Sequence, residues 1–313
     1  MPGRIWILGA SDPEMTAIEH LLLDQGERVE YATVYRDGVR RRVRPSEAYA
    51  SDVGIGSDLR GINLTAYAVE CRPAVLYGTA SDGIDWAGLV CTIDHHRPGD
   101  PGYGRPPAEY WSASSIGQVV AALDLDYWVP DGGAQYDGMP SGYAPRRARG
   151  YSDVWHHALS PQHALVAAAD HCLGAAYRGE CPGVHPRLLM RWRAADRAAR
   201  QGRAVAEVLL DIEATTAALC AAPLLALEQP GARAVTVRDM RREPPYPELP
   251  EAACRADLGY VSGPLVGPDG RRKYTCSGSP EQVSAWLDHW APAEGLVDLY
   301  GDPARGFAGG WRR

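Results

Sequence analysis

Gly88-Leu89-Val90-Cys91-Thr92-Ile93-Asp94-His95-His96 is the stretch that decides the fold. Its first six residues form a short apolar run, which predicts a strand buried on both faces. The run ends abruptly in one carboxylate and two imidazoles, and the following Pro98 and Gly99 break the chain. Ligands of α/β proteins bind just beyond the carboxyl ends of the strands. Since carboxylate suits Mg and Mn and imidazole suits several transition metals, these three side chains are a candidate metal site. The alternative is a strand that merely ends in polar residues.

The start of the chain predicts a β-α-β unit and therefore a parallel sheet. Ile5–Leu8 is expected as the first strand and Val29–Val34 as the second. Between them, Asp12 and Pro13 supply the N-cap and the first position of a helix. Asp12 and Glu14 are then expected at the carboxyl end of the first strand, as candidate metal ligands. A helix cap and an acid in the first turn explain the same two residues without a metal.

A third strand is predicted over Ala74–Tyr77, and it is followed by Gly78 and, one turn of chain later, by Asp82. Asp82 is therefore a further candidate ligand. Three strands would deliver their carboxyl ends to one edge of the sheet.

Two helices are predicted next. The first covers Ser112–Leu123 by its apolar spacing, and the second begins at Pro161 and runs through Asp170 and His171. An Asp-His pair late in a helix is either a surface feature or part of a site. Between the helices, residues 128–152 form a long irregular stretch typical of a lid, a binding segment or disorder.

The second half predicts a helical linker and a smaller α/β domain. The helical pattern over Leu188–Ala222 fits one or two long helices. The expected organisation is an N-terminal domain, 1–190, with a parallel sheet, a linker, 191–228, and a C-terminal domain, 229–313. The C-terminal elements are expected to be a strand over Ala232–Arg238, a hairpin of Tyr260–Val266 and Arg271–Cys276, a helix from Ser279 to Trp290 and a strand over Leu296–Tyr300.

A Gly-rich stretch follows the last predicted strand. Gly306, Gly309 and Gly310 would let the backbone approach a ligand closely, and Arg305 could hold a phosphate. The alternative is a frayed tail.

Composition limits the classes of function. The 313 residues are 45% hydrophobic and 23% charged, with a formal net charge of -7. This acidic balance argues against strong nonspecific binding to duplex nucleic acid, but a bound metal can supply the local positive charge that a phosphate substrate needs. The seven scattered cysteines contain no C-x-x-C pair, which favours reduced thiols in a cytoplasmic protein. No apolar run is long enough for a signal peptide or a membrane span, so no membrane partner is expected.

The order of these motifs resembles the DHH phosphoesterase superfamily, named for the sequence found here as Asp94-His95-His96. That family includes RecJ-type exonucleases, nano-RNA and cyclic-dinucleotide phosphodiesterases, and family II inorganic pyrophosphatases. The resemblance covers nearly the whole chain. The segment from Ala10 to Glu14 stands in the place of the first-strand motif, Asp170 in that of the fourth-motif Asp, and 305–310 in that of the Gly-rich substrate motif.

The chain also departs from the family pattern. Ala10 replaces the first-motif His, and the second acid of that motif falls on Glu14 or Thr16, depending on the register. The second-motif Asp corresponds to Gly78, and the tail lacks the usual His. These losses leave three alternatives for the two-metal centre of the family: a rearranged pair of metals, one metal, or none.

The resemblance implies a Mn- or Mg-dependent phosphoesterase that hydrolyses a phosphodiester or phosphoanhydride in a small nucleotide or short oligonucleotide. The alternatives are a non-catalytic member that binds a nucleotide or a protein partner, and a subunit that forms homo-oligomers through the linker helices. The implied catalytic residues are Asp94, His95 and His96; the implied metal ligands are Asp12, Glu14, Asp82, Asp94, His95 and Asp170; the implied substrate contacts are His96, His171, Arg305, Gly306, Gly309 and Gly310.

Overall fold

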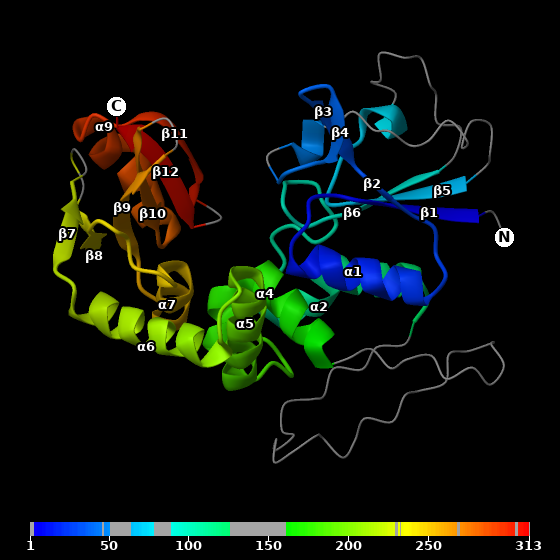
Figure 1. The fold of residues 1–313 in the computed structure, drawn as a ribbon, viewed down its shortest axis with the longest axis horizontal. Coiled ribbons are helices and arrows are strands. Elements are labelled where there is room, and N and C mark those ends of the chain that lie inside the picture. Colours follow the sequence, from blue (N-terminus) through cyan, green and yellow to red (C-terminus); the bar gives the residue numbers. More distant parts are fainter. Residues whose placement is uncertain are drawn as a thin grey trace. The chain divides into compact units, whose positions relative to one another are not determined.

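The fold is α/β, with a parallel sheet in the N-terminal part, helices in the middle and a mixed sheet in the C-terminal part (Figure 1). At this level the predicted fold class is confirmed. A computed structural model describes residues 3–45, 47–50, 64–77, 89–125, 161–228, 231, 233–267, 270–303 and 306–312. The chain divides into two compact units, residues 1–192 and 193–313, and the boundary falls within one helix, α5 (Pro186–Gln201).

The first unit is built on four parallel strands in the order β2-β1-β5-β6. Its elements are β1 (Gly3–Leu8), α1 (Pro13–Asp24), β2 (Val29–Tyr31), the β3 (Thr33–Arg36) and β4 (Val39–Arg42) hairpin, η1 (Ala48–Ala50), β5 (Leu64–Val69), η3 (Ala74–Tyr77), β6 (Val90–Ile93), η4 (Pro107–Glu109), α2 (Tyr110–Ala113), α3 (Ser115–Ala122) and α4 (Pro161–Tyr177).

The two faces of this sheet are covered differently, because successive side chains of a strand point to opposite faces. Trp6 and Leu8 of β1 pack with the apolar sides of α1, α3 and α4. Ile5 and Ile7 face the other way, into a smaller cluster with Val43, after the β3–β4 hairpin, and residues of η1 and η3. The side chains of β1 are therefore buried on both faces of the sheet, against helices on one face and against irregular chain on the other.

Three strand predictions need correction. Ala74–Tyr77 is a 3-10 helix, and the third strand is instead β5, which lies between β1 and β6. The predicted strand Val29–Val34 is divided between β2 and β3, which belong to different sheets. The strand that ends at Asp94 is not buried on both faces, since Thr92 is exposed and only Ile93 of β6 is fully buried. β6 is an edge strand within the described part of the sheet.

The helices of the first unit are interrupted close to the predicted site. The helix expected over Ser112–Leu123 is two helices, α2 and α3, separated by the extended residue Ser114, whose side chain caps α3 by accepting from the amide of Gly117. α4 contains one non-helical residue, Cys172 (φ -155°, ψ 54°), directly after Asp170 and His171.

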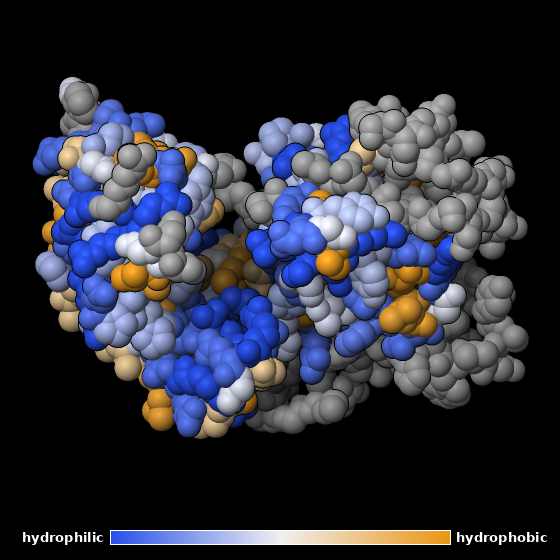
Figure 2. Space-filling view, turned by 45° about the horizontal axis from the view of Figure 1, so that its top comes forward, coloured by the Kyte–Doolittle hydropathy of each residue, from blue (hydrophilic) through white to orange (hydrophobic). Residues whose placement is uncertain are grey.

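The helical middle consists of two helices, α5 and α6 (Val205–Ala221), one of the two outcomes expected for Leu188–Ala222. They are separated at Gly202, whose φ of +63° favours glycine. No helix in the described part of the chain has the length and apolar character needed to cross a membrane. The visible surface of the described residues is largely hydrophilic, with separate apolar patches (Figure 2).

The second unit contains a six-stranded mixed sheet in the order β11-β12-β10-β9-β8-β7. Only the pair β8–β9 is parallel among these neighbours. The elements after α6 are β7 (Leu224–Leu227), β8 (Val235–Arg241), α7 (Leu249–Ala256), β9 (Tyr260–Val266), β10 (Arg272–Ser277), α8 (Pro280–Ala285), a π-helical turn η5 (Trp286–Trp290), α9 (Ala291–Ala293), β11 (Val297–Asp302) and β12 (Phe307–Arg312).

The Gly-rich stretch is not a frayed tail, because it contains β12, an inner strand of this sheet. A side chain at Gly309 would lie 2.4 Å from the hydroxyl of Tyr300, and one at Gly310 would lie 2.5 Å from the side chain of Leu299. Packing against β11 therefore accounts for both glycines.

Candidate metal centre

The centre begins where β1 and β5 end side by side. A Cβ atom at Gly9, just after β1, would lie 2.4 Å from the carbonyl oxygen of Glu70, which directly follows β5. Only glycine permits this approach. Glu70 itself has a φ of +49°, and its amide donates to the carbonyl of Ile93 at the end of β6. Three strand ends are thus held together, with Glu70 in the middle.

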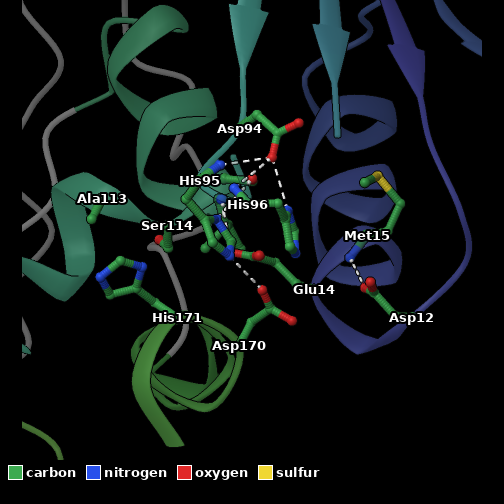
Figure 3. A network of polar contacts seen from close by, with 12 residues as sticks. Asp12, Glu14, Met15, Asp94, His95, His96, Ala113, Ser114, Asp170 and His171 are labelled. Atoms are coloured by element: carbon green, nitrogen blue, oxygen red, sulfur yellow. Dashed lines mark hydrogen bonds and ion pairs between the residues drawn. The ribbon is translucent and has the colours of Figure 1, made fainter. Parts of the chain in front are cut away.

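Four side chains bring ligand atoms together at this edge. One ligand atom from each of Glu70, His95, His96 and Asp170 lies within 4.8 Å of the others. Glu70 follows β5, the two histidines follow β6, and Asp170 projects from α4 toward the histidines (Figure 3). The described residues therefore contain a buried group that could hold a metal ion, as expected. His95 and Asp170 were predicted as ligands and His96 as a catalytic and substrate-binding residue, whereas Glu70 was missed.

Asp94 lies beside this group and accepts four hydrogen bonds. Its Oδ1 accepts from the amides of His95 (2.7 Å) and His96 (3.1 Å) and from Nδ1 of His96 (2.8 Å), while its Oδ2 accepts from the Tyr49 hydroxyl (2.7 Å). Asp94 is 1% exposed and holds the imidazole of His96 by one nitrogen, which leaves Nε2 available to a ligand. This is the arrangement by which a carboxylate orients a metal-binding histidine.

His95 is fixed from several sides. Its Nε2 contacts Oδ2 of Asp170 at 2.8 Å, and its Nδ1 lies 3.4 Å from the hydroxyl of Ser115 at the start of α3. Its ring stacks on that of His96, with 4.3 Å between centroids. A Cβ atom at Gly102 would lie 2.7 Å from Cβ of His95, so this glycine leaves room for the histidine.

Asp12 and Glu14 differ in where their side chains point. Asp12 caps α1 by accepting from the amide of Met15 at 2.7 Å, so its side chain turns back toward its own helix (Figure 3). Glu14 is 1% exposed and points toward the histidines. One of its oxygens accepts from the amide of Ile116 at 3.0 Å, and the other has no hydrogen-bond partner within the described structure.

His171 stands at the border of the group. Its ring meets that of His95 edge-on, with 5.3 Å between centroids, and its Nε2 donates to the carbonyl of Arg105 at 3.1 Å. Burial lowers the pKa of His171, so the ring is neutral near pH 7. Its Nδ1 has no hydrogen-bond partner within the described residues.

Several acidic side chains lie close together in the centre, and burial and mutual repulsion change their pKa values. Burial and repulsion from the Asp170 carboxylate raise the pKa of Asp12 and, more strongly, that of Glu14. The same two causes raise the pKa of Glu70 to about 7. The pKa of Asp170 is about 2, because the hydrogen bond and charge of His95 outweigh its burial. Burial would lower the pKa of His96, but its bond to Asp94 and the nearby acids raise it to about 9.

These residues fit a divalent cation. Glu70 Oε1 is a buried oxygen with no hydrogen-bond partner in the described part of the chain. The negative charge of Asp170 raises the pKa of both Glu14 and Glu70, and a bound cation would relieve this repulsion. Two imidazoles with carboxylate oxygens form a ligand set that suits Mn and related metals.

The remaining predicted site residues lie elsewhere. Asp82, Gly78, Arg305 and the segment 128–152 lie outside the described residues. Gly306, Gly309 and Gly310 belong to the second unit, where Gly306 has a φ of +70° and a side chain there would lie 2.8 Å from the carbonyl oxygen of Gly278.

Comparison with known proteins gives no relative: no protein-family model matches the chain, and a search of curated proteins finds no match. The site must therefore be interpreted from its own geometry.

Proposed function

We propose that the first unit binds a divalent cation, Mn or Mg, at Glu70, His95, His96 and Asp170, and that the protein is a phosphoesterase of DHH type. Its substrate would be a phosphodiester or phosphoanhydride in a small nucleotide or short oligonucleotide. The observation that carries the proposal is the convergence of four ligand atoms within 4.8 Å at the carboxyl ends of β5 and β6. When bound, a divalent cation lowers the pKa of a coordinated water and neutralises charge on a phosphoryl group.

Glu70 strengthens the resemblance to that superfamily. The family pattern places an acid after a strand between the first motif and Asp-His-His, and Gly78 does not supply one. Glu70 follows a strand in that interval and adjoins both neighbouring strand ends. We infer that Glu70 takes the place of the second-motif acid.

An anionic substrate is supported by Arg97, the residue directly after Asp-His-His. Its guanidinium lies 3.4 Å from the centroid of the Tyr49 ring, and the hydroxyl of that ring donates to Asp94. Arg97 is exposed and makes no ion pair among the described residues. A planar guanidinium held in this way beside the centre could bind a phosphate through two hydrogen bonds.

The other polar groups have roles that follow from their contacts. Asp94 holds the imidazole of His96 in one orientation, and Ser115 and Asp170 do the same for His95. Because Nε2 of neutral His171 carries the proton, its Nδ1 could accept a hydrogen bond from a hydroxyl group of a substrate.

A non-catalytic binding role is the second candidate, and one observation favours it. Asp94 directs both oxygens to hydrogen bonds within the protein, and Ala10 replaces the family's first-motif His, so two ligands of a complete two-metal centre are not supplied. A protein with one metal could bind a nucleotide without hydrolysing it.

The decisive experiment combines Mn²⁺ titration with product analysis. We expect Glu70→Gln, which preserves shape but removes a ligand charge, to weaken Mn²⁺ binding by at least about 10-fold. Glu109→Gln, a change at an exposed acid paired with Arg105, is the matched control and should leave binding unchanged. With Mn²⁺, the wild-type chain should release phosphate or mononucleotide from a panel of dinucleotides, cyclic dinucleotides and pyrophosphate. Metal binding without any product would favour the second candidate, and equal binding by both variants would refute the assigned ligands.

A further inference from the structure

Two cysteines lie in sulfur contact, and one of them, Cys172, follows Asp170 of the candidate metal centre by two positions in α4. Sγ of Cys172 and Sγ of Cys181 are 3.2 Å apart. We propose that this pair is a redox-sensitive modification site, which closes to a disulfide under mild oxidation by a peroxide and thereby locks the helix break that presents Asp170.

The geometry favours this bond over any other among the described cysteines. A disulfide needs about 2.0 Å between sulfurs, so only a small approach of the two side chains is required. Cys172 is partly exposed, which gives a small oxidant access, whereas Cys181 is buried. The other five cysteines are Cys71, Cys91, Cys220, Cys254 and Cys276, and no sulfur contact joins any of them.

The backbone at Cys172 connects the pair to the centre. Cys172 is the non-helical residue within α4, and Asp170, which contacts His95, precedes it by two positions. A return of Cys172 to helical dihedral angles would turn the preceding residues relative to the following ones. A bond to Cys181, which is anchored in the apolar core, would prevent this change. The disulfide therefore preserves the conformation in which Asp170 meets His95.

The chemistry balances with hydrogen peroxide as the oxidant. One thiol of the pair, as its thiolate, attacks a peroxide oxygen, the O–O bond breaks, and a sulfenic acid and one water result. The other thiol then attacks that sulfur, forms the S–S bond and releases a second water. Two thiols lose two protons and two electrons, and one peroxide becomes two waters. A dithiol reductant reverses the reaction by thiol–disulfide exchange.

The bond itself does not depend on the proposed function, so it is tested first without metal. Purified full-length protein is treated with stoichiometric peroxide, the remaining thiols are alkylated, and the peptides are mapped by mass spectrometry. We expect a reducible cross-link between Cys172 and Cys181, with a mass loss of about 2 Da, and alkylation of the other five cysteines. Cys220→Ser, at an exposed position of α6, should form the same cross-link, whereas Cys172→Ser should not.

The effect on the centre is measured by Mn²⁺ titration of the oxidised and reduced wild-type protein. Oxidation should lower the Kd several-fold, and Cys172→Ser should remove the difference. A pair that stays reduced while other thiols react, or that bonds to other cysteines, overturns the modification site. A cross-linked pair with an unchanged or higher Kd overturns the coupling. Absence of Mn²⁺ binding in both states refutes the proposed metal centre and leaves the mapped bond as a separate result.

Discussion

At the scale of single residues, the candidate ligands are oriented by hydrogen bonds from neighbouring side chains. Asp94 receives the Tyr49 hydroxyl on one oxygen and His96 on the other, so the tyrosine is connected to the imidazole through one carboxylate. Tyr49 is therefore a positioning residue for His96, with Asp94 and His96 between it and any bound cation.

Tyr49→Phe tests this connection. The substitution removes the hydrogen bond but keeps the ring on which Arg97 stacks, so we expect Mn²⁺ affinity to fall about 10-fold or more, as for other partners of metal-binding residues. Isothermal titration with Mn²⁺ measures it. Tyr103→Phe, at an exposed tyrosine of the same unit, is the control. Wild-type affinity in Tyr49→Phe would show that Asp94 orients His96 without help.

The site was only partly predictable from its residues. Asp94, His95 and His96 are adjacent in sequence, whereas Asp170 was predicted as a ligand only through the resemblance to the DHH superfamily, in which it stands in the place of the fourth-motif Asp. Glu70 was missed because the strand before it, Leu64–Val69, contains small and polar residues, whereas Ala74–Tyr77 is a shorter but more apolar run. Short apolar runs do not distinguish a strand from a helical turn by periodicity. The alternation in Leu-Thr-Ala-Tyr-Ala-Val followed by an acid was the available signal.

At the scale of elements, the break between α2 and α3 serves the centre. Because Ser114 is extended, a new helix starts beside the strand ends, with Ser115 at His95 and the amide of Ile116 at Glu14. A continuous helix over Ser112–Leu123, which apolar spacing predicted, would leave that amide bonded within the helix. The spacing of apolar residues indicates which face of a helix is buried, but it does not reveal that one residue between two helices, here Ser114, is extended.

Ser114→Ala should lower the free energy of unfolding by about 1 kcal/mol, because the first turn of α3 loses its cap. Ser112→Ala removes an exposed hydroxyl two positions away and should change stability by less than about 0.5 kcal/mol. Urea denaturation of both variants measures the difference. If both variants are equally stable, the cap does not define the start of α3.

At the scale of the whole molecule, the buried acids couple stability to pH. The raised pKa of Glu70, about 7 against an ordinary 4.5, means that the folded chain retains a proton that the unfolded chain has lost. The contribution of this proton to the free energy of unfolding is fully present below pH 4.5, the ordinary pKa of a glutamate, and is lost as the pH rises toward 7. The pKa of His96 is raised to about 9, so its contribution to the free energy of unfolding is also lost as the pH rises from its ordinary pKa of 6.5 toward 9.

We therefore expect the Tm of the metal-free protein to fall between about pH 5 and pH 9, and Mn²⁺ to raise the Tm more at about pH 8 than at about pH 5, because protons and metal compete for the same ligands. Thermal unfolding in chelator and in Mn²⁺, at a series of pH values, measures both effects. Glu70→Gln should flatten the dependence below pH 7. A Tm that is constant or rises through this window would contradict the assignment of buried, protonated acids.

β12 has a consequence for biosynthesis. It lies between β10 and β11, although it follows both of them along the chain. Until residues 307–312 leave the ribosome, β10 can pair only with β9 and β11 has no neighbour in this sheet, and unpaired strand edges promote aggregation. A nascent chain that stalls before residue 307 would therefore have an open edge in the second sheet, where chaperones and proteases could bind.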